Sequence, residues 1–241
     1  MPTRLQHLVV DAHDLAALAT FWAEALGWKI TSEEPGEVVV EPPGGVPGLP
    51  LVFVQVPEPK TVKNRIHLDL ASPSMQEQPA IVERLIRLGA RPVDIGQVDV
   101  PWVVLADPEG NEFCVLEPRE QYGDTGALAA VVVDAADPLG IAPFWATATG
   151  WTIVERGDDF VSLRSPSGAG PWLEFLRAAE PKTVKDRLHL DVAPFPDDDH
   201  AAEVAALIKL GATPADVGQG EVRWVVLADP EGGEFCVLTP R

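Results

Sequence analysis

The pattern of hydrophobic and polar positions predicts a strand, a helix and three more strands, and the same order then starts again. Residues 5–11 alternate with the period of a strand, whereas apolar residues in the stretch 15–26 recur at helical spacing. Asp14 is a capping residue before this helix, and Gly27 is a residue that ends one. The expected elements of the first half are strands at 5–11, 28–32, 37–41 and 51–56 with a helix at 15–26, then strands at 65–70, 92–96, 102–106 and 112–116 with a helix at 76–88.

This arrangement occurs again in the second half of the chain. The segment WVVLADPEG at 102–110 recurs without change at 224–232, and Phe21-Trp22 recurs as Phe144-Trp145. The chain therefore contains four βαβββ modules, each too short to build an adequate core alone. We expect an α+β protein in which two modules join into a curved eight-stranded sheet, with helices outside and a trough inside. The expected domains are residues 1–120 and 127–241, and residues 121–126 are expected to link them.

One strand of each half carries an unusual polar face. In KNRIHLDL at 63–70 the side chains of Arg65, His67 and Asp69 point to the same side, and Arg187, His189 and Asp191 repeat this order. A cation, an imidazole and an anion in a row suit a polar cavity. The charged pairs could form a structural ladder across the trough or a clamp for a polar ligand. His67 and Asp69 are also the best candidates for an acid–base pair.

Composition narrows the classes of partner. Lys and Arg number 18 against 37 Asp and Glu, which gives a formal net charge of −19. Such acidity disfavours nucleic acid and anionic membrane surfaces, and it is compatible with a cationic ligand or simply with a solvated surface. No apolar run is long enough to span a bilayer. The two cysteines, Cys114 and Cys236, are too few for a disulfide framework and fit a reducing cytosol, so a cytoplasmic protein is expected.

Three motifs carry a family resemblance. They are HLVVD at 7–11, HLD at 67–69 and DPEGN at 107–111, and all recur in the second half with changes. Together they resemble the vicinal oxygen chelate superfamily, which has the glyoxalase, bleomycin-resistance and dioxygenase fold. The resemblance implies tandem glyoxalase-like domains over nearly the whole chain. It does not imply one activity, because this fold hosts lyases, dioxygenases, epimerases and non-catalytic drug binders.

The resemblance also implies where a metal would be held, and there this chain departs from the family. The four ligand positions, usually His and Glu, fall on His7, Val52, His67 and Cys114 in the first half and on Ala130, Glu174, His189 and Cys236 in the second. Neither half offers two His and a carboxylate. If modules paired across the halves, His7 would meet His189 and Cys236, while Glu174 would meet His67 and Cys114. We therefore expect no metal cofactor, and the alternative is a divalent metal such as zinc at His7, His67 and Cys114.

These observations favour a protein that binds a small molecule in a polar and aromatic trough without a catalytic metal, as in bleomycin-resistance-like sequestration. The alternative is a metal-dependent lyase or dioxygenase, so the sequence leaves open whether the protein is an enzyme. Trp102 and Trp224 could stack on a planar ligand or simply pack in the wall. The chain is expected to act as a monomer or homodimer. The expected ligand-binding residues are His7, Arg65, His67, Asp69, Trp102, Cys114, Glu174, Arg187, His189, Asp191, Trp224 and Cys236.

Overall fold

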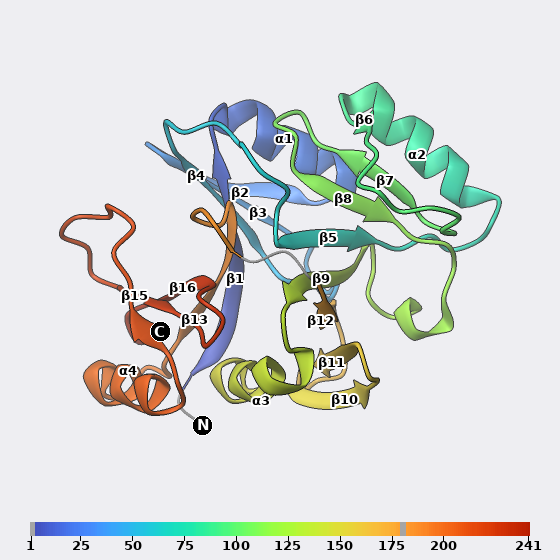
Figure 1. Cartoon of the computed structure of the whole chain (residues 1–241). Coiled ribbons are helices and arrows are strands. Elements are labelled where there is room, and N and C mark those ends of the chain that lie inside the picture. Colours follow the sequence, from blue (N-terminus) through green and yellow to red (C-terminus); the bar gives the residue numbers. More distant parts are fainter. Residues whose placement is uncertain (1–2, 179–181) are drawn as a thin grey trace.

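A computed structural model describes residues 3–178 and 182–241, and it contains the four predicted βαβββ modules (Figure 1). Residues 1, 2 and 179–181, which belong to the expected domains, lie outside the described residues. The first half comprises β1 (Arg4–Ala12), α1 (Leu15–Leu26), β2 (Lys29–Glu34), β3 (Glu37–Glu41), β4 (Leu51–Gln55), β5 (Ile66–Leu70), α2 (Glu77–Leu88), β6 (Arg91–Pro92), β7 (Val103–Ala106) and β8 (Glu112–Val115). After a 3-10 turn η1 (Glu120–Tyr122), the second half comprises β9 (Leu128–Ala135), α3 (Pro138–Thr149), β10 (Thr152–Arg156), β11 (Phe160–Arg164), β12 (Trp172–Arg177), β13 (Leu188–Ala193), α4 (His200–Lys209), β14 (Thr213–Pro214), β15 (Val225–Ala228) and β16 (Glu234–Val237).

The predicted elements agree with this order to within a few residues, and the local signals explain the helix ends. The Asp14 side chain accepts a hydrogen bond from the amide of Ala17 at the start of α1, and Gly27 ends the helix in a left-handed conformation at φ +67°. The strand expected at 92–96 is wrong beyond Pro92. There the Asp94 carboxylate accepts from the Gly96 amide at 2.8 Å, and Gly96 has φ +83°, so the chain turns away from the sheet.

The strands form two eight-stranded sheets, and each sheet joins modules from different halves of the chain. Sheet A has the strand order β14-β15-β16-β13-β1-β4-β3-β2, and sheet B has the order β10-β11-β12-β9-β5-β8-β7-β6. At the junctions β1 pairs with β13 and β5 pairs with β9, both antiparallel. The eight-stranded sheet of two modules is thus confirmed, and the pairing is the one across the halves that the sequence left as an alternative.

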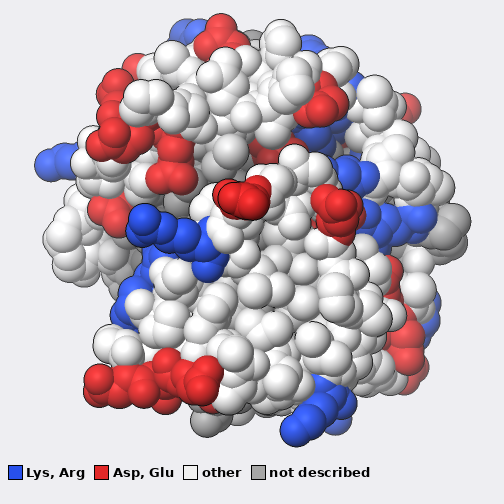
Figure 2. All heavy atoms as spheres, turned by 90° about the vertical axis from the view of Figure 1, so that its left-hand side faces the viewer, with Lys and Arg blue, Asp and Glu red and all other residues white. Residues whose placement is uncertain are grey.

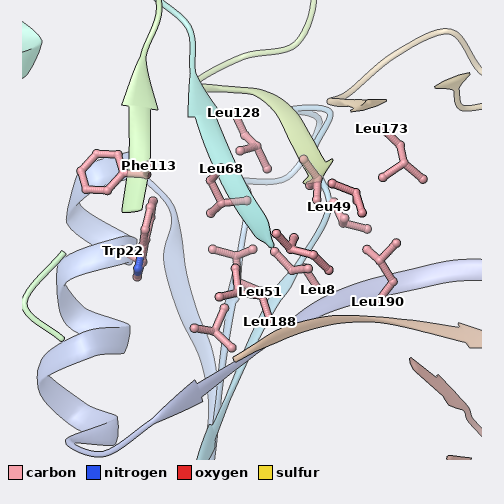
Figure 3. Packing of buried hydrophobic residues seen from close by; sticks show 14 of the residues in the cluster. Leu8, Trp22, Leu49, Leu51, Leu68, Phe113, Leu128, Leu173, Leu188 and Leu190 are labelled. Carbon is pink, nitrogen blue, oxygen red and sulfur yellow. The ribbon is translucent and has the colours of Figure 1, made fainter. Parts of the chain in front are cut away.

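A single hydrophobic core connects the two sheets. Leu8 and Leu188 of sheet A pack near Leu68 and Leu128 of sheet B in the same cluster of buried side chains (Figure 3). The helices cover the outer faces of the sheets, α1 over β2–β4 and α3 over β10–β12. Trp22 of α1 is 3% exposed and meets the ring of Phe113 edge to face at 5.1 Å. The polar faces of the strands are consequently left for the concave sides.

The DPEG turn at 107–110 braces the second module of the first half against the first module. Asp107 accepts hydrogen bonds from the amides of Glu109 and Asn111 and from the indole of Trp22. The Glu109 carboxylate then accepts from the amides of His13 and Asp14, at the start of α1. An anion at this place satisfies free helix amides and complements the helix dipole. The turn between β7 and β8 therefore holds the start of α1 in place.

Acidic and basic side chains are interspersed on the face that lies to the left in Figure 1, and an uncharged area lies below the centre of that face (Figure 2). None of the helices in the described ranges has the length and apolar character that crossing a membrane requires.

Candidate functional site

The trough of sheet B contains a cavity of about 430 Å³ at its polar strand face. His67 and Asp69 come from β5, Cys114 from β8 and Glu174 from β12, and all four line this cavity. Asp69 lies opposite Cys114 on one neighbouring strand and opposite Ala130 on the other. Because modules pair across the halves, Glu174 belongs to the same trough as His67, although the two residues are far apart in sequence.

The groups on the floor of this cavity are close and mostly buried. One ligand atom each from His67, Asp69 and Cys114 lie within 4.8 Å of one another, and His67 Nε2 is 3.6 Å from Asp69 Oδ1. Glu174 accepts a hydrogen bond from the Tyr122 hydroxyl at 3.1 Å and one from the Ser162 hydroxyl at 3.4 Å. Asp69 Oδ1 is buried and has no hydrogen-bond partner.

Burial determines the protonation states of the titratable side chains on the floor of this cavity. It raises the pKa of Asp69 to about 7, and the nearby Glu174 carboxylate adds to that shift. Burial also raises the pKa of Glu174 and lowers the pKa of His67 to about 4. The Cys114 thiol is likewise raised in pKa, first by burial and then by Asp69. His67 is therefore neutral at pH 7, and Asp69 titrates near that pH.

The trough of sheet A holds a related cluster with different electrostatics. His7 Nε2 lies 3.0 Å from Asp191 Oδ2, and His189 Nε2 lies 3.4 Å from Asp191 Oδ1. Cys236 Sγ lies 3.6 Å from His189 Nε2. Burial alone would raise the pKa of Asp191, but hydrogen bonds from His189 and His7 lower it to about 2. Asp191 is therefore an ionised carboxylate between two imidazoles.

Arg65 and Arg187 do not belong to either cluster, so the expected ladder or clamp with Asp69 and Asp191 is wrong. Arg65 pairs with Glu231 at 3.3 Å, and Arg187 pairs with Glu109 at 2.8 Å. Both arginines precede the first residue of their strand, where the alternation of faces no longer holds. They brace the DPEG turn of the other half instead of facing a trough.

The metal set His7, His67 and Cys114 is divided by the fold, because His7 lies in sheet A and the other two lie in sheet B. Two other groups could hold an ion: His67, Asp69 and Cys114, and His189, Asp191 and Cys236. His7 adds a second imidazole to the sheet A group through its contact with Asp191. Two imidazoles, a carboxylate and a thiol are donors that zinc accepts, so the sheet A set fits zinc better than the sheet B set.

The two tryptophans at the strand starts differ in their surroundings. Trp102 lines the sheet B cavity, and its indole donates to the Gln97 side chain at 2.8 Å. Trp224 is 40% exposed. Only Trp102 is therefore placed at the wall of the described cavity.

The sequence analysis missed Tyr122, which is buried and contacts Glu174 although its segment was expected to be a linker. It also missed Arg119, whose guanidinium lies 5.7 Å from the Trp102 ring, and Ser162. One signal was present for Tyr122, because it is the only tyrosine of the chain. Ser162 alternates with apolar neighbours in β11, but its facing depends on which strands pair.

Comparison with known proteins places this geometry in context. A family model described as "Glyoxalase-like domain" matches residues 7–116 and again residues 130–238. No curated protein matches the sequence. Glyoxalase I from Zea mays has a similar structure, with 14% identity, a TM-score of 0.67 and coverage of 98% of this chain and 92% of that one. A protein described as a "putative dioxygenase" from Bacillus subtilis subsp. subtilis str. 168 has 16% identity, a TM-score of 0.64 and coverage of 98% and 84%. At these identities the two structures show a shared fold.

Proposed function

Since the chain belongs to the glyoxalase-like domain family, we propose that it binds a small organic cation in the trough of sheet B, by a mode that needs no metal ion there. The proposed role is sequestration of the bound molecule. The observation that carries this proposal is the pairing of charges around the cavity, which leaves buried carboxyl groups without a basic partner.

The basic side chains that line the cavity already have carboxylate partners. The pairs are Lys63–Asp134 at 2.5 Å, Arg119–Glu117 at 2.6 Å and Arg177–Asp159 at 2.7 Å. Among residues 3–178 and 182–241, no Lys or Arg forms an ion pair with Asp69 or Glu174. A ligand with an ammonium group and hydrogen-bond donors would supply the missing charge in a site shielded from water.

Aromatic side chains form part of the wall above these carboxyl groups. Trp102, Tyr122 and Phe160 line the same cavity. Rings of this kind attract cations through their faces and provide apolar contact area for a planar molecule. The cavity volume of about 430 Å³ is within the range of small-molecule sites.

The proposal is tested by calorimetric titration with three matched probes: 2-phenylethylammonium, 2-phenylethanol and phenylacetate. We expect the cation to bind at least about tenfold more tightly than the neutral probe, and the anion not to bind. Glu174→Gln should remove most of this preference while keeping the shape of the site. Trp102→Phe should weaken all binding, and Trp224→Phe is its matched control in sheet A.

Two results would overturn the proposal. One is equal binding of the three probes, or binding of none of them, by folded wild-type protein. The other is a preference for the cation that persists in Glu174→Gln. Circular dichroism of each variant separates a loss of binding from a loss of folding.

A second candidate function rests on the sheet A cluster. His7, His189, Asp191 and Cys236 together form a set of zinc donors at one place in the trough of sheet A. Bound zinc would supply Lewis-acid chemistry of the kind that lyases use. In that case the four side chains would hold the ion, and the ionised Asp191 would be a negatively charged ligand between the two imidazoles.

Metal content decides this second candidate. Protein purified without a metal-affinity tag should contain about one zinc per chain, and His7→Ala should lower that content strongly. His67→Ala is the matched control, since His67 lies in the other sheet. Wild-type protein that takes up no zinc even after dialysis against it would contradict this function.

A further inference from the structure

A second cavity, of about 660 Å³, lies outside both troughs. It is bordered by the end of α1, by α2, by the end of β5 and by the segment from Glu117 to Ala127 that precedes β9. Its apolar lining includes Leu70, Ile81 and Ala127. Arg119 and Tyr122 line both this cavity and the sheet B trough, so they separate the two spaces.

Two polar atoms at this cavity have no partner. Glu117 binds Arg119 Nε through Oε1 at 2.6 Å, whereas its Oε2 is buried without a hydrogen bond. The hydroxyl of Ser72, a residue that is 6% exposed, is unpartnered as well. The guanidinium of Arg84, which also borders the cavity, donates to the carbonyls of Glu24 and Ala25 at the end of α1. Two residues that border the cavity therefore have polar atoms whose hydrogen bonds are not made within the protein.

The internal repeat shows which group occupies the corresponding place in sheet A. Arg4 lies opposite Ala193 at the β1–β13 junction, and Ala127 lies in the same register beside Ala71 at the β9–β5 junction. The guanidinium of Arg4 lies 4.4 Å from the centre of the Phe195 ring and donates to the carbonyl of Arg241.

Smaller residues stand at the matching positions of sheet B. Ala127 stands where Arg4 does, and Pro73 stands where Phe195 does, whereas Glu117 takes the place of Thr239. Replacing arginine by alanine removes a long side chain and a cation. Glu117, which stands where sheet A has Thr239, adds a carboxylate beside the space that the missing arginine side chain leaves.

We infer that this cavity is a second ligand site and that it takes a small molecule with an alkyl chain and a guanidinium group. The alkyl chain would lie along Leu70 and Ile81, as the aliphatic stem of an arginine would. The guanidinium would donate to the carboxylate of Glu117, which borders the cavity and has one oxygen without a hydrogen-bond partner. A planar group with several donors suits a carboxylate better than a single ammonium does.

The test uses n-butylguanidinium, n-butylammonium and butyrate as probes for the full chain, with binding followed by calorimetry. We expect n-butylguanidinium to bind with a dissociation constant on the order of 1 mM and to bind more tightly than the other two. Glu117→Gln should weaken its binding at least about tenfold. Ala127→Arg should abolish it, because the new side chain would fill the cavity.

Matched variants separate this site from the trough. Thr239→Ala, at the counterpart of Glu117 in sheet A, should leave binding unchanged. Because the sheet B trough is itself proposed to take cations through Glu174, the titrations are repeated in Glu174→Gln protein, where the remaining binding of n-butylguanidinium should still depend on Glu117 and Ala127. Loss of binding in Glu174→Gln but not in Glu117→Gln would overturn the inference, as would butyrate as the preferred probe or no binding at all. If Ala127→Arg does not fold, as judged by circular dichroism, Glu117→Gln decides the outcome.

Discussion

The two troughs contain the same three side chains, yet they hold their central carboxyl group in opposite states. His189, Asp191 and Cys236 of sheet A correspond to His67, Asp69 and Cys114 of sheet B. The pKa of Asp191 is lowered to about 2, because hydrogen bonds from His189 and His7 outweigh the effect of burial. The pKa of Asp69 is raised to about 7 by burial and by Glu174.

The difference comes from residues on neighbouring strands rather than from the shared triad. Sheet A places His7 beside its aspartate, where sheet B has Ala130. Sheet B places Glu174 on β12, where sheet A has Val52 on β4. Ala130 in place of His7 removes a hydrogen-bond donor, and Glu174 in place of Val52 adds an anion. Both differences favour the protonated form of Asp69. Two duplicated sites can thus acquire different charges through residues that lie beside the repeated motif.

The largest effect is expected from Asp191→Asn, which removes a buried carboxylate held by two imidazoles. We expect a loss of about 3 kcal/mol in the free energy of unfolding at pH 7, against less than about 1 kcal/mol for Asp69→Asn. Urea unfolding in the presence of a chelator measures both. Equal losses for the two variants would show that the troughs are electrostatically alike.

The pH dependence should differ between these variants. Asp69 has a folded-state pKa of about 7 against an ordinary value of 3.8, so its contribution to stability is present below pH 3.8 and is lost as the pH rises toward 7. Asp69→Asn should therefore gain about 4 kcal/mol relative to wild type between pH 4 and pH 8. Asp191 has a pKa lowered to about 2, so its contribution is present above pH 3.8 and is lost as the pH falls toward 2.

The measurement is urea unfolding at a series of pH values, analysed as the difference between each variant and wild type. This difference cancels the opposing effect of His67, whose pKa is lowered to about 4. A stability difference for Asp69→Asn that stays constant from pH 4 to pH 8 would refute the raised pKa.

Ala130→His tests the exchange that distinguishes the troughs. The new imidazole would lie beside Asp69, as His7 lies beside Asp191, and would donate to its carboxylate. We expect Asp69 to become at least about tenfold more acidic, as followed by carbon NMR of its carboxyl group during a pH titration. Ala130→Ser is the control for added volume, and an unchanged titration of Asp69 in Ala130→His would contradict this account.

The smallest difference is expected at the thiols, which both troughs share. Burial is the first cause that raises the pKa of Cys114 and of Cys236, and a neighbouring aspartate is the second. Both should react with iodoacetamide at pH 7 at least about tenfold more slowly than in urea-unfolded protein, with similar rates. Mass spectrometry of each cysteine measures this, and rapid labelling of only one would show that the shared triad is not equivalent.

The sequence by itself determined the elements, the fourfold repeat and the faces of the strands. Periodicity and capping residues are local properties, so α1 and its cap at Asp14 were predictable, as was the burial of Trp22 on its inner face. The shared polar positions His67, Asp69 and Cys114 followed from the same alternation together with the family resemblance.

Only the tertiary structure decided which modules pair, and this choice determined the composition of each trough. The four modules present similar strands, so β1 and β9 were both plausible partners for β5, and no local pattern distinguishes them. The choice of β9 placed Glu174 and Tyr122 beside His67 and left His7 with Asp191. Strand pairing is decided by packing between distant segments, whereas the period of a strand is decided by its own backbone.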